Sequence, residues 1–151
     1  MNNKNYIQGK FKPKNPQKYN GDPTNIIYRS SYELKFMQYC DLTESVNTWK
    51  SEEFHILYKD PFSNLTRRYF PDFFLKYKDK DGNMRNLVVE IKPAKDLKEP
   101  PTNPPKRTKS WAYSVKMWAT NQAKWKAAKE WCEDHNYEFR ILTERDLGIQ
   151  K

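Results

Sequence analysis

The alternation of apolar and polar residues along the chain predicts two amphipathic helices. Apolar side chains recur at helical spacing over residues 30–42, and Ser30 and Glu33 form the S-x-x-E arrangement that caps many helix N-termini. Residues 111–134 place three tryptophans and Gln122 along one stripe of a longer helix. Because Gln122 stands where an apolar residue is expected, it is either a hydrogen-bonded core residue or a polar group that reaches a functional site.

Short runs of aromatic and β-branched residues predict four strands. These runs lie at residues 53–58, 68–77, 85–91 and 137–142. The second and third runs flank residues 79–83, whose Asp-Lys-Asp-Gly-Asn sequence is typical of a β-hairpin turn. The predicted order is helix, three strands, helix, strand. We therefore expect an α/β fold in which helices flank one mixed sheet.

Two irregular segments hold much of the positive charge. The chain has 151 residues, with 28 Lys and Arg against 19 Asp and Glu and a formal net charge of +9. Residues 1–20 contain lysines but no acid, and their low apolar content predicts a flexible basic arm before a single domain over residues 21–151. Prolines among basic residues predict an extended basic loop at 93–110. The charge indicates a polyanionic partner, and leaves open DNA, RNA or a membrane surface.

Composition also bounds where the protein works. No run approaches the roughly 18 apolar residues of a membrane span, and the N-terminal residues contain no apolar leader segment. We therefore expect a protein that is neither embedded in a membrane nor secreted by that route. The two cysteines lie far apart and form no CxxC pair, which argues against a disulfide framework or a zinc site and favours a reducing compartment.

Charged residues interrupt the two most apolar strands. Asp72 lies in Phe-Pro-Asp-Phe-Phe, and Glu90 and Lys92 lie in Val-Val-Glu-Ile-Lys, where a charge is costly unless it has a partner. Side chains alternate across a strand, so Glu90 and Lys92 share one face. A turn centred on Asp81 sets Asp72 directly across from Glu90, and a turn centred between Asp81 and Gly82 shifts the pairing by one residue. Two carboxylates about 5 Å apart repel unless one is protonated or a cation lies between them, and Mg²⁺ suits such oxygen ligands.

This arrangement resembles the motif of the PD-(D/E)xK nucleases, in which Pro-Asp on one strand precedes Glu-Ile-Lys on the next. The resemblance implies a restriction-endonuclease-like core in the order αβββαβ, a bound Mg²⁺ for which Mn²⁺ can substitute, and a lysine that orients or helps deprotonate the attacking water. The catalytic residues that it implies are Glu33, Asp72, Glu90, Lys92 and Gln122. The metal ligands that it implies are Glu33, Asp72, Glu90 and Ile91.

A wider resemblance covers about residues 20 to 147. Residues 28–33, 40–41 and 68–72 are similar to the head completion nucleases of T-even-like tailed phages, and also to the catalytic domains of TnsA-type transposon endonucleases. The resemblance implies hydrolysis of phosphodiester bonds in packaged DNA ends, in the host cytoplasm and in the virion, with portal or head proteins as further partners and no membrane. The residues expected to bind DNA phosphates are Lys10, Lys12, Lys14, Lys18, Lys95, Lys106, Arg107 and Lys109.

Each of these assignments has a structural alternative. Glu33 can complete a capping box instead of a metal site. Asp72 and Glu90 can form surface ion pairs with Lys76 and Lys92, in which case Lys92 only neutralises Glu90. At the level of the whole protein, the alternative to an enzyme is a non-catalytic protein that holds DNA ends or closes the phage head with the same fold.

Overall fold

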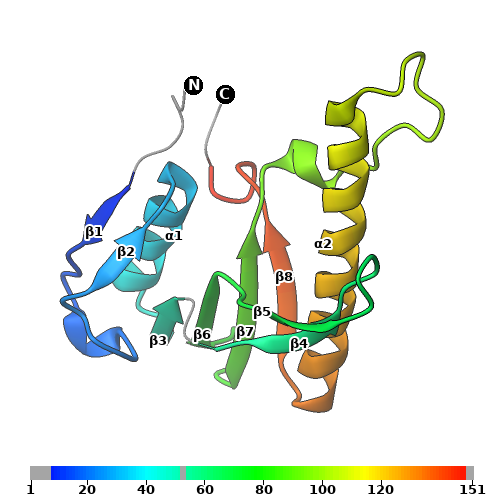
Figure 1. Ribbon diagram of the computed structural model, residues 1–151. Coiled ribbons are helices and arrows are strands. Elements are labelled where there is room, and N and C mark those ends of the chain that lie inside the picture. The colour runs from blue at the N-terminus through cyan, green and yellow to red at the C-terminus, as the bar shows by residue number, and fades with distance from the viewer. Residues whose placement is uncertain (1–7, 52–53, 149–151) are drawn as a thin grey trace.

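A four-stranded mixed sheet forms the centre of the computed structural model, which describes residues 8–51 and 54–148 (Figure 1). The strands are ordered β3 (Val46–Ser51), β6 (Phe73–Lys78), β7 (Met84–Ile91) and β8 (Glu138–Leu142). β3 pairs antiparallel with β6, and β6 pairs antiparallel with β7. β7 and β8 pair in parallel because a long helix connects them. The predicted α/β fold with a mixed sheet is thus confirmed.

One helix covers each face of the sheet. α1 (Ser31–Leu42) is capped by Ser30, whose hydroxyl accepts the N–H of Glu33 at 3.1 Å. α2 (Lys109–Asp134) is capped in the same way by Thr108. Both caps satisfy backbone donors that the first helical turn leaves unpaired, which explains why the helices begin at these residues.

Two small hairpins complete the layers. β1 (Gly9–Phe11) pairs with β2 (Ile26–Tyr28) beside α1, and β4 (Ile56–Lys59) pairs with β5 (Thr66–Tyr69) beside α2 (Figure 1). One helix and one hairpin therefore lie on each side of the central sheet: α1 with β1 and β2 on one side, and α2 with β4 and β5 on the other.

The sheet separates two hydrophobic cores. The α1-side core and the α2-side core contain no buried residue in common. The α1-side core is built from Phe11, Tyr19, Ile26, Phe36, Met37, Cys40, Val46, Trp49, Phe73, Leu75, Val89 and Ile91. The α2-side core is built from Ile56, Tyr58, Tyr69, Trp125 and Ala128. Neighbouring positions of β6 and β7 thus face different cores, as the alternation of side chains along a strand requires.

The N-terminal segment differs from the predicted flexible arm over residues 1–20. Residues 1–7 lie outside the described residues, but residues 8–20 are packed into the fold. Phe11 and Tyr19 are buried against Trp49, with ring centroids 5.9 and 4.7 Å from its ring. Two large aromatic side chains remove enough apolar surface from water to offset the ordering entropy that the polar composition suggested.

Buried Asp41 at the end of α1 holds the same segment by hydrogen bonds. Its carboxylate accepts the backbone N–H groups of Lys14 at 2.8 Å and Asn15 at 2.9 Å. Lys18, at the end of the short 3₁₀ turn η1 (Pro16–Lys18), donates its ammonium to the carbonyls of Asp41 and Thr43 at the C-terminus of α1. These contacts neutralise a buried charge and the negative end of a helix, so the segment is part of the domain.

Other element boundaries also differ from those predicted. β3 was not predicted as a strand, and the run at 68–77 is divided into β5 and β6 by a bend at residues 70–72. The basic loop begins with the 3₁₀ turn η2 (Ala94–Leu97) and then stays irregular up to α2, largely as predicted. No helix among the described residues is long and apolar enough to cross a membrane.

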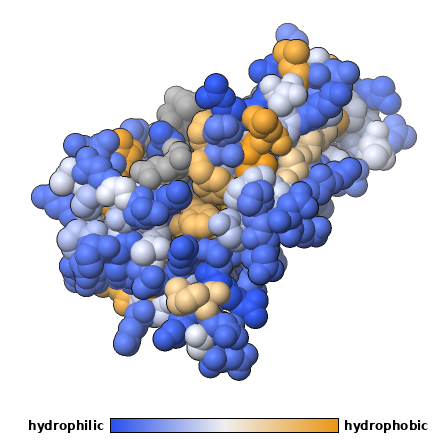
Figure 2. Space-filling model, turned by 90° about the horizontal axis from the view of Figure 1, so that it is seen from below, coloured by the Kyte–Doolittle hydropathy of each residue, from blue (hydrophilic) through white to orange (hydrophobic). Residues whose placement is uncertain are grey.

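The surface of the molecule is mainly hydrophilic on the face that Figure 2 shows. Seen from below, hydrophilic side chains cover most of this face, and the apolar side chains show mainly in its middle and upper part, with a few separate ones near the rim (Figure 2).

Candidate active site

The hairpin register brings Asp72 and Glu90 together. Phe73 pairs with Val89, and one further step in this register sets Asp72 across from Glu90. This is the register of a turn centred on Asp81, so that one of the two predicted registers is confirmed. The ladder ends at Phe73, and beyond it the Asp72 carboxylate accepts the backbone N–H of Ile91 at 2.7 Å.

Glu90 is the most deeply buried acid of this site, with 5% of its surface exposed. Its Oε1 accepts the hydroxyl of Tyr69 at 2.9 Å, and the hairpin register sets Glu90 across from Asp72. Burial raises the pKa of Glu90, while Lys92, Tyr69, Lys124 and Asp72 act in the opposite direction. The charged form is thus disfavoured by dehydration and supported by nearby donors and cations.

Tyr69 reaches this acid from β5, at the bend that separates β5 from β6. It is 4% exposed, and burial together with the negative charge of Glu90 raises its pKa far above the ordinary value. Tyr69 therefore stays protonated and acts as a fixed hydrogen-bond donor to Glu90.

Lys92 follows Glu90 at the end of β7, on the face predicted from side-chain alternation. It is half-buried, and its charge acts on both Glu90 and Lys124. Its backbone N–H donates to the carbonyl of Leu142 at 3.0 Å, which extends the pairing with β8 by one residue. The backbone is therefore anchored at the position from which this side chain leaves the sheet.

Ile91 lies between these two residues but faces the other way. Its side chain is packed in the α1-side core. Only its backbone carbonyl could serve as the metal ligand that the resemblance implies.

Glu33 is not brought into a three-acid cluster. Its carboxylate accepts the backbone N–H of Arg29 at 3.2 Å, while its own N–H is capped by Ser30. In residues 8–51 and 54–148, no group of three or more His, Cys, Asp and Glu side chains lies close enough to hold a metal ion. The structure thus brings Asp72 and Glu90 together and leaves Glu33 in a capping arrangement at the start of α1.

Gln122 is exposed, so its predicted place in the helix stripe is wrong. The buried positions of α2 at this level are Asn121 and Trp125. At about 100° per residue, Gln122 lies about a quarter of a turn away from Asn121 and so leaves the face that Asn121 and Trp125 bury.

Lys124 is a site residue that the sequence analysis missed. It projects from α2 with its Nζ 5.8 Å from the ring centroids of both Tyr58 and Tyr69. Burial lowers the pKa of Lys124, and the nearby charge of Lys92 acts in the same direction, opposed by Glu90. Its position one residue before the buried Trp125 is the signal that could have identified it.

Glu144 is a second residue that sequence reasoning missed. It lies just beyond β8 and is 4% exposed. Its two carboxylate oxygens accept the N–H of Ala94 at 3.0 and 3.2 Å, and Tyr32 donates its hydroxyl at 3.3 Å. Glu144 thus connects the chain just after Lys92 to the first turn of α1. No pattern in the sequence marks it, because it stands in a short charged segment after the last strand.

The predicted DNA-binding residues lie at two separate places. The β1 strand and η1 lie beside α1, whereas the loop before α2 extends from the other side of the molecule (Figure 1). The ammonium of Lys18 is bonded to two carbonyls at the end of α1, so the structure gives this lysine a role within the fold, and its contact with DNA stays a prediction. The side chains that are exposed are those of Lys10, Lys12, Lys14, Lys95, Lys106, Arg107 and Lys109.

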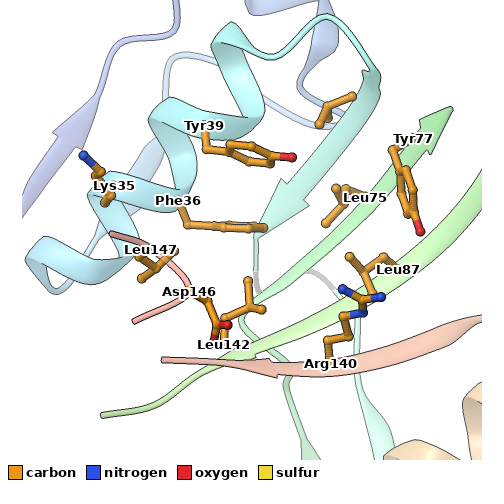
Figure 3. Close-up of a pocket in the computed structure, with 11 residues that line it drawn as sticks. Lys35, Phe36, Tyr39, Leu75, Tyr77, Leu87, Arg140, Leu142, Asp146 and Leu147 are labelled. Atoms are coloured by element: carbon orange, nitrogen blue, oxygen red, sulfur yellow. The ribbon is translucent and has the colours of Figure 1, made fainter. Parts of the chain in front are cut away.

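A cavity of about 460 Å³ lies on the α1 side of the sheet (Figure 3). Phe36 and Tyr39 of α1 face Leu75 and Leu87 of the sheet across it, and Arg140 borders it. Glu90 and Tyr69 are on the other face, so this cavity is separate from the carboxylate pair.

The chemistry of the site follows from its donor set. Asp72 and Glu90 offer adjacent carboxylate oxygens, which are the ligands that hard divalent cations prefer. Mg²⁺ commonly binds through one or two carboxylates and keeps waters and substrate oxygens as its other ligands, so two adjacent acids fit it. The cations of Lys92 and Lys124 lie beside the pair and favour an anionic substrate.

Comparisons with known proteins identify the family of this chain. The family described as TnsA-like endonuclease N terminal matches residues 43–144, a range that includes Asp72, Glu90 and Lys92 and begins after Glu33. The head completion nuclease of Enterobacteria phage T4 is 38% identical over 149 residues, which cover 94% of this chain and 96% of the relative. The α/β fold is consistent with a restriction-endonuclease-like core. Since the family match spans most of the chain and the similar phage protein is a nuclease aligned over nearly its whole length, this chain belongs to the TnsA-like endonuclease family.

Proposed function

We propose that this protein is a Mg²⁺-dependent DNA nuclease that hydrolyses phosphodiester bonds at the site formed by Asp72, Glu90 and Lys92. The observation that carries the proposal is the pair of acids that the hairpin register sets across from each other at the end of inner strands, one of them buried. A purely structural role gives no reason to set two acids against each other at the end of inner strands, because their repulsion costs free energy when both are charged.

Each residue of the site has a definite role in the proposed reaction. Asp72 and Glu90 hold the cation, and the N–H of Ile91 and the hydroxyl of Tyr69 keep their oxygens in position. When bound, Mg²⁺ lowers the pKa of a water molecule and neutralises charge on the phosphate. Lys92 orients that water or takes part in its deprotonation, and it stabilises negative charge on the phosphoryl oxygens.

The exposed basic residues would hold the DNA backbone. Phosphate contacts position a duplex without reading its sequence, so the residues of β1 and of the loop before α2 would add affinity and no sequence preference. Trp111 gives this loop a fixed contact, because its indole N–H donates to the carbonyl of Pro101 at 2.7 Å.

We further propose that the biological substrate is packaged DNA with its ends, cut in the host cytoplasm during completion of the phage head. The support is the similarity to the phage head completion nuclease over nearly the whole chain. In this setting Mn²⁺ would substitute for Mg²⁺, and portal or head proteins would be partners.

The experiment is a cleavage assay on supercoiled, linear and branched DNA with Mg²⁺, Mn²⁺ or EDTA. We expect Asp72→Asn and Glu90→Gln to abolish cleavage, while Glu130→Gln, a change at an exposed acid of α2, leaves it unchanged. Without metal, both site variants should be as stable as the wild type or more so, because one of two adjacent carboxyl groups loses its charge.

Metal binding gives a second readout for the same variants. A ligand that binds only the folded state raises the melting temperature by mass action, so Mg²⁺ should stabilise the wild type and not the two site variants. If Mg²⁺ raises the melting temperature of the wild type and of both variants equally, the metal binds at another site. Cleavage by either variant at the wild-type rate would refute the assignment, and DNA binding without cleavage would favour a non-catalytic end-binding protein.

A further inference from the structure

Two lysines from different elements converge on the carboxylate pair. Lys92 comes from the end of β7 and Lys124 from the middle of α2, and the charges of both act on Glu90. Among the residues that the structure describes, neither ammonium group has a carboxylate at ion-pairing distance. Two cations thus lie near each other and near a buried acid without forming a tight pair with it.

The position of Lys124 is set by the tyrosines under it. Its Nζ is 5.8 Å from the centroids of Tyr58 and Tyr69, and the hydroxyl of Tyr69 donates to Glu90 at 2.9 Å. One side chain therefore supports the lysine with its ring and holds the acid with its hydroxyl. Both tyrosines belong to the α2-side core, so this position is fixed by packing.

This position is unfavourable for a cation in the free protein. Lys124 is half-buried, so it loses part of its hydration, and it lies within the field of another positive charge. Contacts with aromatic rings offset only part of this loss, whereas water solvates an ammonium group well at an exposed position. An anion bound between Lys92 and Lys124 would explain why a lysine occupies this half-buried position.

The anion that fits is a phosphate of the DNA backbone. The carboxylates approach from the strand ends and the second cation from the helix, so a phosphate beside Asp72 and Glu90 would meet Lys92 on one side and Lys124 on the other. We propose that Lys124 is a second phosphate-binding cation of the active site, which contacts the scissile phosphate opposite Lys92. This inference rests on the proposed nuclease function and adds to it a residue from α2.

A purely structural role for Lys124 makes a different prediction. If this lysine only neutralises Glu90, its removal leaves a buried acid with less support and the fold is weakened. If it also binds phosphate, its removal weakens DNA binding and slows cleavage in addition to any loss of support for Glu90. DNA binding and cleavage, and not stability, therefore separate the two roles.

The test uses the full chain with Lys124→Met, which keeps an unbranched apolar side chain and removes the charge, and with Lys124→Arg, which keeps the charge. Lys126→Met, at an exposed position of the same helix, is the matched control. We expect Lys124→Met to reduce the single-turnover cleavage rate at saturating DNA by about tenfold to a thousandfold, as for removal of one charge-stabilising donor in a dry active site. Lys124→Arg should retain more activity than Lys124→Met, and the control should match the wild type.

Binding of duplex DNA in Ca²⁺ or EDTA, measured against salt concentration, is a readout without turnover. Removing one phosphate-binding cation should reduce the magnitude of the slope of log K against log salt by about 0.9 in Lys124→Met, and the slope should stay unchanged in Lys126→Met. An unchanged slope and cleavage rate in Lys124→Met would overturn the proposal. If the wild type cuts no DNA with any metal, the nuclease function fails, and the difference in salt slope still decides whether Lys124 binds phosphate.

Discussion

Replacing Tyr69 by Phe removes a single hydroxyl group from the site. The ring stays in the α2-side core under Lys124, and the group removed is the donor to Glu90 at 2.9 Å. Because Glu90 is buried, water does not readily take the place of the missing donor. The change therefore isolates the hydrogen bond that supports the charged form of this acid.

The size of the effect depends on the charge of Glu90. A hydrogen bond to a charged group contributes about 1.5 to 3 kcal/mol, and one to a neutral group about 0.5 to 1.5 kcal/mol. Burial already raises the pKa of Glu90 above its ordinary value of 4.5, and the Tyr69 hydroxyl opposes that rise. Below the folded-state pKa the acid is neutral, and the variant loses the smaller stability contribution of a hydrogen bond to a neutral group. Above this pKa the acid is charged, and the variant loses the larger contribution of a hydrogen bond to a charged group.

The sign of the pH dependence follows from proton binding. Since the pKa of Glu90 is higher in the folded state than in the unfolded state, the folded state binds more protons and stability falls as the pH rises through the folded pKa. In Tyr69→Phe the folded pKa is higher still, so this fall is larger. The stability gap between wild type and variant should widen from acid to neutral pH.

Urea unfolding in EDTA across this pH range measures the gap directly. At neutral pH we expect a loss of about 1.5 to 3 kcal/mol, or roughly 3 to 12 °C in melting temperature for a chain of this size. In cleavage assays with Mg²⁺, the acid-side decline in rate should move to higher pH. A stability gap that is the same at all pH values, or absent, would refute the view that Tyr69 supports a charged Glu90.

Two further outcomes concern the basic residues. Lys18→Met should lower the free energy of unfolding by about 1 to 2 kcal/mol, because the C-terminus of α1 loses its cation, and should leave cleavage and the salt dependence of DNA binding unchanged; calorimetry and binding isotherms check both. Replacing the three cations of the loop before α2 by Gln should reduce the salt slope by about 0.9 for each phosphate that is no longer neutralised, and should leave single-turnover cleavage at saturating DNA nearly unchanged. The residues replaced in this triple variant are Lys106, Arg107 and Lys109. If the slope is unchanged, the positive charge of the loop serves to bind an acidic protein partner and not DNA.

The sequence predicted the parts of the site that depend on local regularities. Alternation along a strand put Glu90 and Lys92 on one face, and the turn residues allowed two registers, one of which the structure has. The strand β3 was missed because its only buried side chains are Val46 and Trp49, with polar residues between them. In that strand pairing with β6, and not a local apolar pattern, determines the structure.

Contacts between distant residues were beyond the sequence pattern. The N-terminal segment is ordered by a carboxylate 26 and 27 residues away, which no local composition reveals. The charge of Lys124 acts on Glu90 because α2 packs with this side toward the sheet, a rotation that the sequence does not state. The prediction chose Gln122, which is two residues away and on nearly the opposite side of the helix. Glu33 fits a capping pattern in the sequence as well as the metal-ligand position that the resemblance implies, and the structure shows its capping contacts with Arg29 and Ser30.

The division into two cores determines which parts of the site a core substitution would disturb. Tyr69 and Lys124 belong to the layer of β4, β5 and α2, whereas Asp72 and Glu90 lie at the ends of the central strands. Because Tyr69 donates to Glu90 and its ring lies against Lys124, a substitution that loosens the α2-side core would displace the donor of the acid and the second cation together. The α1-side core contains neither residue, so a change there would reach them only through the sheet.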